Sequence, residues 1–490
     1  MNTLSTSLNE NLKSFEKLLP SEDILTYAFA TKDGAPCALI YADGIVNKEL
    51  LGRLVIEPVS ALSLKNGGTV YKTNEEAIEK TVRFPELKTN KEIPQLVKEI
   101  LDGNAVLLVE GVQTGFIAGA KLLPVRTPTE PPTNVAVKGP REGFIEDVKT
   151  NMSLLRKRLK TPDLLLETLR VGKRSETIVC ICYLAGTANE NLVKEIREKL
   201  QAVEIDSIPD SSYIATLLAP RKHSVFRSVG TTEKPDVFAS KLSEGRIGLL
   251  VDGSPIALTL PYILMEDLQS PEDYYISPFM AGVVRALRLI AIFLSMFLPA
   301  FYVSAQLFKM QLLPLGLMLT IASSVRELPL SPSLEMFVVL FLFEVLREAS
   351  IRMPKYVGMS LSIVGALVLG ETAVSAGFLS TPAIIIVAVS GICLYTVPEF
   401  VETGSILRWL FLIIGGSIGP FGIVLLSAFL LCYLVSADSF NTPLLSPFSP
   451  WQGKDMKDAV AKYSLTELNE RPQFLHSQNK IRFRFKEDSK

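Results

Sequence analysis

The chain has 490 residues and a mass of 53.9 kDa, enough for two or three domains. Its formal net charge of −1 and its pI near 6.3 give no indication of a nucleic-acid partner. The mean hydropathy of +0.30 is high for a soluble protein. Residues 1 to about 275 have an ordinary globular composition, whereas residues 288 to about 433 form a succession of apolar runs. The sequence therefore predicts a soluble region followed by a membrane region.

The first residues, MNTLSTSLNENLKSF, have no basic region followed by an apolar core, and so do not resemble a signal peptide. We therefore expect the soluble region to lie on the cytoplasmic side. Arg285 and Arg288 flank the start of the first apolar run, and the C-terminal residues are rich in lysine and arginine. By the positive-inside rule, this pattern predicts a cytoplasmic C terminus as well.

The soluble region contains an internal duplication. The segment ALIYADG (38–44) matches CICYLAG (180–186), and GNAVLLVEG (103–111) matches GRIGLLVDG (245–253). The glycines at 44 and 186, at 103 and 245, and at 111 and 253 are each 142 residues apart. This register predicts two copies of one α/β subdomain, each with a strand, a turn, a helix, a variable helical stretch and a two-stranded hairpin.

The sequence offers no catalytic constellation. Glu110 and Asp252 precede the glycine of each predicted hairpin turn, and we interpret them as turn residues because both copies need the turn and neither acid has a partner base nearby. The chain has two histidines and five cysteines, and the cysteines form no CxxC motif. It also has no P-loop, GxGxxG, HExxH or GxSxG motif. This inventory favours neither an enzyme nor a metal or cofactor site. We expect the cysteines to be core residues, as is typical of a reducing compartment.

A proline-rich stretch separates the two copies, and a basic amphipathic segment follows it. The prolines predict an extended connector over 124–143. In the following segment, apolar residues recur at helical spacing beside a basic run that ends at Lys160. A helix of this kind binds a membrane surface or an acidic partner, or packs on the core with a solvated basic face, and we slightly favour the core-facing alternative.

Together these patterns predict a fold class and a set of boundaries. The fold class is α/β in the soluble region, as two duplicated α/β subdomains, followed by an all-α multi-span membrane domain. The predicted parts are an N-terminal extension (1–35), subdomain I (36–123), the connector (124–143), subdomain II (144–275), the transmembrane domain (276–437) and a cytoplasmic C-terminal tail (438–490).

Five or six membrane crossings are expected. The apolar segments are 288–307, 312–323, 333–349, 357–379, 381–398 and 406–436. A full helical span needs about 20 residues, so we expect the second segment to be a half-span or a helix packed inside the bundle. The last segment is broken at GGSIGPFG, where Gly415 and Gly419 form a GxxxG pair suited to helix packing and Pro420 predicts a kink.

The fourth apolar segment carries one acid, Glu371, in the run SIVGALVLGETAVSAGF. Helical spacing places small residues for helix packing on one face, at Ser362, Ala366, Gly370, Ala373 and Gly377. The acid lies on the other side, with Ser360, Val364, Leu367 and Ser375. An ionised carboxylate facing lipid costs about 3 kcal/mol or more, whereas one beside a water-filled path costs little and attracts cations.

The residues alone leave three alternatives open for this acid. In the first, Glu371 lines a pore or vestibule; in the second, it pairs with Arg347, Arg352 or Arg408; in the third, it reaches the membrane interface. The segment EVLREASIRMP (344–354) has charges three to five residues apart, a spacing that predicts intrahelical ion pairs. We weigh an interface or hinge role for this segment equally against a snorkelling helix end.

Five long motifs carry a resemblance to a known family. They are GPREGFIEDVKTNMSLLRKRLKTPDL, VDGSPIALTLPYIL, SPEDYY, EVLREASIRMP and SIVGALVLGETAVSAGFLSTP. In this order, and over residues from about Leu39 to Pro450, the chain resembles the A-subunit family of bacterial spore germinant receptors, the GerA type. It departs from the family after the first span, where LFKMQLLP, with Lys309, stands in place of a His-Pro-Glu type turn.

The resemblance implies a three-part nutrient receptor in the inner membrane of the dormant spore. The implied partners are a B subunit resembling amino-acid transporters, which binds the nutrient, and a C subunit that is a lipoprotein. The implied A subunits form a homo-oligomer, a five-fold ring around an ion path that opens on nutrient binding and releases monovalent cations. The alternative is a non-conducting signalling scaffold that relays nutrient binding by the B subunit to a separate channel.

The resemblance also assigns roles to residues of this chain. It favours pore lining by the acid-bearing side of the fourth segment, although the family often has a neutral amide at the position of the acid. The pore-lining candidates are Ser360, Val364, Leu367, Val368, Glu371 and Ser375. The inter-subunit or interface candidates are Arg141 and Glu142 in the GPREGF motif, with Glu344, Arg347 and Arg352.

Overall fold

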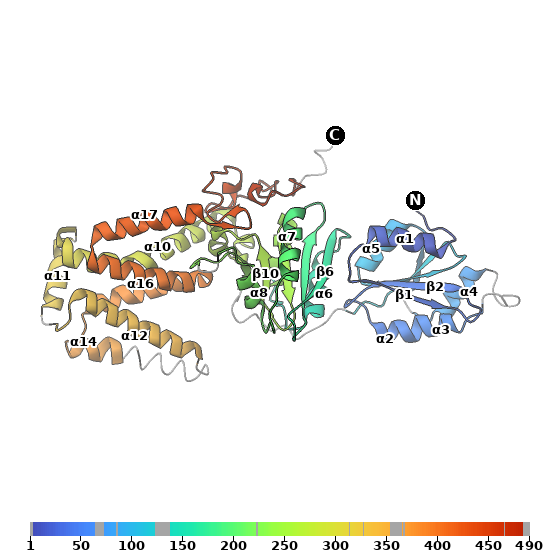
Figure 1. Ribbon diagram of the computed structural model, residues 1–490, viewed down its shortest axis with the longest axis horizontal. Helices are drawn as coiled ribbons and strands as arrows, with labels where there is room; N and C mark the ends of the chain where they lie inside the picture. Colours follow the sequence, from blue (N-terminus) through green and yellow to red (C-terminus); the bar gives the residue numbers. More distant parts are fainter. Residues whose placement is uncertain are drawn as a thin grey trace.

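The computed structural model describes residues 3–63, 73–84, 87–122, 138–221, 224–312, 314–326, 328–352, 365, 368–464 and 466–483. The parts follow one another along the longest axis of the molecule (Figure 1). The first α/β subdomain lies at one end, the second lies in the middle, and the apolar helices lie at the other end. The C-terminal segment returns to the second subdomain. The predicted fold class is confirmed.

The first subdomain is an antiparallel sheet with helices on both faces, in the order β1-β2-β4-β5-β3. Its strands are β1 (Ile24–Ala30), β2 (Pro36–Ala42), β3 (Leu87–Asn90), β4 (Ala105–Val109) and β5 (Gly115–Ala118). Its helices are α1 (Leu8–Leu18), α2 (Lys48–Leu51), η1 (Gly52–Ile56), α3 (Glu57–Ser60), α4 (Asn74–Thr81) and α5 (Ile93–Leu101). Along β2, Leu39 packs under α2–α4 and Ile40 under α1 and α5, because successive side chains point to opposite faces.

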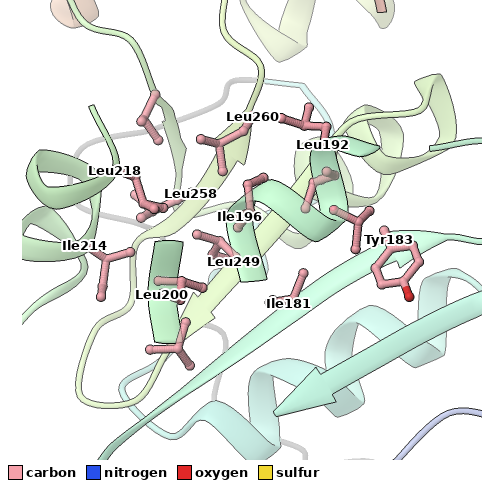
Figure 2. Close-up of a cluster of buried hydrophobic side chains, with 14 of the residues drawn as sticks. Ile181, Tyr183, Leu192, Ile196, Leu200, Ile214, Leu218, Leu249, Leu258 and Leu260 are labelled. Atoms are coloured by element: carbon pink, nitrogen blue, oxygen red, sulfur yellow. The ribbon is translucent and has the colours of Figure 1, made fainter. Parts of the chain in front are cut away.

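The second subdomain repeats this arrangement, with the strand order β6-β7-β9-β10-β8. Its strands are β6 (Leu164–Val171), β7 (Thr177–Leu184), β8 (Gly230–Thr232), β9 (Ile247–Val251) and β10 (Ala257–Leu260). Its helices are α6 (Val148–Arg158), α7 (Glu190–Gln201), α8 (Ser211–Leu218) and α9 (Pro235–Glu244). Figure 2 shows one face, where Ile196 of α7 and Ile214 of α8 lie over Leu249 of β9. Cys180 and Cys182 both face α6 and α9 on the other side. The prediction that the cysteines are core residues holds for these two and for Cys37, but it was wrong for the exposed Cys432, and Cys393 is only partly buried.

The duplication extends to the loops that start the first helix of each copy. The Asn11 amide accepts from the backbone N–H of Ser5 at 2.8 Å and donates to its carbonyl at 2.8 Å. Asn151 makes the same two bonds with Ile145, at 2.8 and 2.5 Å. These bonds satisfy backbone groups beside a helix start, and the two copies do so in the same way.

The acids of the two hairpin turns have a structural partner. Glu110 accepts from the backbone N–H of Leu8 at 2.7 Å, and Asp252 accepts from that of Val148 at 3.2 Å. Leu8 and Val148 are the first residues of α1 and α6. A carboxylate at a helix N-terminus satisfies an otherwise unpaired donor and interacts favourably with the helix dipole. Each hairpin acid therefore holds the first helix of its own copy.

The predicted N-terminal extension, residues 1–35, belongs instead to the first subdomain. Helix α1 packs in its core, and β1 pairs with β2 over its whole length. They correspond to α6 and β6 of the second copy, so the repeat begins near the N terminus. The match was hidden because few of the residues that make these contacts are identical between the copies.

A buried ion pair joins the two subdomains. Arg156 of α6 donates from Nε and Nη2 to the carboxylate of Asp23, at 2.9 and 2.7 Å. The two side chains are 2% and 3% exposed. The same guanidinium donates to Ser21 at 3.2 Å and to the carbonyl of Leu164 at 3.1 Å. One residue of the predicted basic run thus lies in the interior, where the bidentate geometry compensates for its desolvation.

The apolar half of the chain is helical. Its helices are α10 (Pro278–Phe308), α11 (Leu315–Val325), α12 (Pro332–Arg352), η5 (Val368–Thr372), α14 (Ala373–Ser375), α15 (Thr381–Tyr395), η6 (Pro398–Phe400), α16 (Val401–Ser417) and α17 (Pro420–Ser436). Among the described residues, two helical stretches are long and apolar enough to cross a membrane, Pro278–Phe308 and Pro398–Ser417. Helix α10 lies at the centre, in contact with α12, α15, α16 and α17.

Two helices replace the single kinked helix predicted over 406–436. Helix α16 ends at Ser417, and Gly419, with φ of +76°, precedes the new helix α17. Helix α17 packs against α16 in the reverse direction (Figure 1). Pro420 is the first residue of α17, a position where its missing N–H has no intrahelical partner to lose. The prediction of a kink at Pro420 was therefore wrong.

Candidate functional site in the apolar half and at its junction

Glu371 lies on a π-helical turn that begins at Val368 and is followed by the short helix α14. The side chains of Glu371 and Ser375 are both exposed, and the Ser375 hydroxyl donates to the carbonyl of Glu371 at 2.6 Å. Gly377, with φ of +69°, ends this segment. The other candidates of this helix, Ser360, Ser362, Val364, Ala366 and Leu367, lie outside the described residues.

The small residues of this region divide into two groups. A Cβ at Gly415 would lie 3.0 Å from the carbonyl oxygen of Ala300, so α16 and α10 pack as closely as their backbones allow. Around Gly370 and Gly377, a Cβ would meet no atom within 4 Å in the described part of the chain. Ala373 is partly buried against a neighbouring cluster. The described end of the predicted packing stripe is therefore largely uncovered.

A polar cluster joins three apolar helices. Arg408 of α16 is fully buried and forms an ion pair with Glu344 of α12, and it donates to Ser390 of α15 at 3.2 Å. Arg347 forms a second ion pair with Glu344 at 2.9 Å and donates to Ser405 at 2.7 Å. Charged residues among apolar helices are stabilised by pairing with one another, and this cluster follows that rule.

The three arginines considered as partners of Glu371 are thus engaged elsewhere. Arg347 and Arg408 share Glu344, and Arg352 forms an exposed ion pair with Glu348 at 2.6 Å, one turn away on α12. The intrahelical pairs predicted from the spacing of this segment are present. In the described part of the chain, the ion pairs of these three arginines are with Glu344 and Glu348 rather than with Glu371.

The GPREGF motif lies on the second subdomain. Glu142 forms ion pairs with Lys157 at 3.1 Å and with Arg158 at 2.9 Å, and Arg141 is exposed. Together with the pair of Arg156 and Asp23, these pairs give most of the basic residues at the end of α6 an acidic partner within the same chain. We infer that the run stabilises the soluble region, which agrees with the core-facing interpretation of this helix.

The same motif reaches the linker that leads to α10. A Cβ at Gly139, where φ is +113°, would lie 2.7 Å from the ring of Tyr275, so this contact requires glycine. The Tyr275 hydroxyl donates to Asp236 of α9 at 3.0 Å. The backbone N–H of Phe144 donates to the carbonyl of Glu233 at 2.8 Å. The motif, α9 and the linker therefore form one packed unit.

Charged side chains line a cavity of about 170 Å³ between this unit and the start of α16. Arg227 forms an ion pair with Glu399 at 2.6 Å, which ties the second subdomain to the residues before α16. Glu266 pairs with Lys241 at 2.6 Å. Burial raises the pKa of the Asp267 carboxyl to about 7, although the nearby Arg227 guanidinium acts in the opposite direction.

Comparison with known proteins places these features in a family. A sequence model described as "Bacillus/Clostridium GerA spore germination protein" matches residues 10–474. The chain belongs to this family. The GerA-type chain is 33% identical to spore germination protein KA of Bacillus subtilis (strain 168) over 485 residues, covering 98% of this chain and 88% of the relative. It is 32% identical to spore germination protein B1 of the same organism over 491 residues, covering 98% and 100%.

A solved structure also matches. It is the crystal structure of the N-terminal domain of the A subunit of the Bacillus megaterium spore germinant receptor GerK3, which is 29% identical. The match covers 52% of the GerA-type chain and 95% of that structure, with a TM-score of 0.42. The family assignment rests on the sequence matches rather than on this likeness. Membership in the family supports a role in spore germination.

Sequence reasoning missed three polar residues that hold the apolar half of the GerA-type chain. Arg408 appeared only as a candidate partner of Glu371. Glu335 of α12 is fully buried and accepts from the backbone N–H of Ser380, the N-cap of α15, at 2.5 Å. Asp273 of the SPEDYY motif is fully buried beside α10. The available signal was a charge within or beside an apolar run, because such charges need a partner.

Proposed function

We propose that the protein is the A subunit of a nutrient receptor in the spore inner membrane and forms an oligomeric, nutrient-gated cation channel that triggers germination. The single observation that carries this proposal is the exposed Glu371 in the apolar half of the chain. In lipid this carboxylate would cost about 3 kcal/mol or more, whereas beside a water-filled path it would attract cations.

Several copies of the chain would be needed to enclose such a path. The uncovered surface at Gly370 and Gly377 leaves room for the close approach of another helix, which is the usual role of small residues in membrane interfaces. We propose a homo-oligomer, a pentameric ring, together with a transporter-like B subunit and a lipoprotein C subunit. The soluble region and the C-terminal segment would face the cytoplasm, with α10 as the first crossing.

The experiment is potassium efflux from vegetative cells that express the chain with its B and C partners. Nutrient addition should release potassium, and Glu371→Gln should reduce the rate because the carboxylate no longer concentrates cations. Glu402→Gln is the matched control, since this exposed acid lies in the first turn of α16. An intact complex that releases no potassium on nutrient addition contradicts the proposal.

A second candidate is a non-conducting scaffold that relays nutrient binding by the B subunit to a separate channel. It is supported by individual contacts that join the second subdomain to the apolar half, such as the ion pair between Arg227 and Glu399. Under this alternative, Glu371→Gln leaves the potassium flux unchanged, while replacement of the exposed Arg141 abolishes signalling. The two variants therefore separate the two candidates.

A further inference from the structure

The C-terminal segment, residues 438–483, is folded against the junction between the second subdomain and the apolar helices, rather than extended from it. Its first residues form a short antiparallel pair, β11 (Asp438–Ser439) and β12 (Thr442–Pro443). Two turns follow, η7 (Asp455–Lys457) and η8 (Gln473–Leu475). In Figure 1 this segment lies between α17 and the second subdomain. It touches three parts of the molecule, each through a different set of contacts.

The first contact fixes the start of the segment to the second subdomain. Phe440 is 5% exposed and belongs to the main core of that subdomain, with the ammonium of Lys199 4.8 Å from its ring centroid. The Ser439 hydroxyl donates to the carbonyl of Ser228 at 2.6 Å and accepts from the backbone N–H of Tyr262 at 3.0 Å. A buried aromatic ring with buried hydrogen bonds beside it makes a firm anchor.

The second contact is a small apolar core shared with the linker between β10 and α10. The linker and the C-terminal segment contribute three buried residues each. They are Ile263, Met265 and Leu268 from the linker, and Ala459, Phe474 and Leu475 from the segment. Neither part buries these side chains alone, so the linker depends on the segment for its packing.

The third contact holds the N-terminal end of α10. Arg285 is fully buried and donates from Nε to Asp273 of the linker at 2.9 Å. Its Nη1 donates to the carbonyl of Asp458 at 2.9 Å, to the carboxylate of Asp458 at 2.9 Å, and to the carbonyl of Ala459 at 2.8 Å. The C-terminal segment thus supplies three of these four acceptors. The Tyr274 hydroxyl donates to Asp458 at 2.8 Å, so one carboxylate binds both the linker and α10.

The end of the segment returns to α9. Arg471 donates from Nε to the carbonyl of Ser243 at 2.8 Å, and the Ser477 hydroxyl donates to the carbonyl of Glu244 at 3.0 Å. Arg482 forms an ion pair with Glu244 at 3.5 Å. Ser243 and Glu244 are the last residues of α9. The segment is therefore attached to the second subdomain at both ends and to α10 in its middle.

We propose that residues 438–483 are a strap that couples the second subdomain to α10, with Asp458 as the joint. A displacement of the subdomain moves both ends of the strap, and the contacts of Asp458 and Ala459 with the buried Arg285 carry the displacement to the first apolar helix. The buried Arg285 suits this task because loss of the strap would leave donors of its guanidinium without acceptors in the interior. The proposal goes beyond the proposed channel function and does not depend on ion conduction.

The test is hydrogen–deuterium exchange on the full-length chain within its receptor complex. Asp458→Ala removes a charge-assisted bond to Arg285, so exchange in residues 278–288 should become about tenfold faster. Lys454→Gln is the control, because it breaks only the exposed pair between Lys454 and Glu470 within the strap. Exchange of residues 278–288 in Asp458→Ala at the control rate would overturn the proposal.

A second variant separates a strap from a local contact. Arg471→Gln weakens the attachment of the strap's end to α9, because the Arg471 guanidinium donates to the carbonyl of Ser243 and, within the strap, to those of Asn479 and Ile481. If the strap couples the two parts, exchange in residues 278–288 also rises, by about two- to threefold. If only residues 235–244 and 466–483 respond, Asp458 is a local clamp and the coupling is refuted. This variant also decides the question if Asp458→Ala fails to assemble.

Discussion

The two soluble subdomains have the same strand order and the same helix-start contacts, yet they are connected to the rest of the chain very differently. The described contacts of the first copy to the rest of the chain converge on the second, chiefly through Asp23 and Arg156. The second receives Phe440 of the C-terminal segment in its core and contacts the residues before α16 through Arg227. The two subdomains therefore share one fold, but in the described part of the chain it is the second that links the soluble region to the apolar helices.

The largest expected effect comes from separating the two copies. Arg156→Ala leaves Asp23 buried without its partner, so the soluble region should lose about 3–5 kcal/mol in its free energy of unfolding. Lys157→Gln changes the neighbouring residue of α6, whose ion pair is partly exposed, and should cost about 1 kcal/mol or less. Thermal unfolding of the purified complex compares the two. Equal losses would show that Arg156 does not join the copies.

The next test uses the duplication itself. Leu107 of β4 and Leu249 of β9 lie at equivalent positions and are 1% and 0% exposed. Leu107→Ala and Leu249→Ala should each cost about 2–5 kcal/mol, because each leaves a cavity in its own core. Only the second should also speed hydrogen exchange in residues 438–446, since Phe440 packs in the same cluster as Leu249. Acceleration by both variants would mean that the two copies are equally coupled to the C-terminal segment.

Much of the fold could be predicted because it is encoded locally. Periodicity and turn glycines located β2, β4, β5 and their counterparts, and hydropathy located the apolar helices. The short strands β3 and β8 were missed because they have few apolar residues. The pairing of Arg408 with Glu344 joins positions 64 residues apart, so local patterns do not encode it. The surroundings of Glu371 also could not be predicted from the sequence, because they depend on which helices pack beside it.

A pH dependence should appear in the linker of the second copy. The pKa of Asp267 is raised from an ordinary value of 3.8 to about 7, so the folded state binds its proton more tightly than the unfolded state does. Stability should therefore fall as the pH rises from about 4 to 7 and level off above that range. Asp267→Asn should remove this decline and make the variant more stable than the parent chain at pH 8. Unfolding midpoints at pH 5 and pH 8 measure it, and an unchanged decline in the variant would contradict the assignment.

The smallest expected effect on stability concerns the hairpin acid that each copy places at the start of its first helix. Glu110→Ala and Asp252→Ala each remove the acceptor for the first backbone N–H of a helix, α1 in one copy and α6 in the other. Each should cost about 1 kcal/mol, the usual value of a helix cap. Because both acids do the same work, the two losses should agree, and the double variant should show their sum. Chemical denaturation of the purified complex measures all three. A much larger loss for Asp252→Ala would mean that this acid also supports the contact between α6 and the first copy. The two hairpin acids would then have different roles although the two subdomains share one fold.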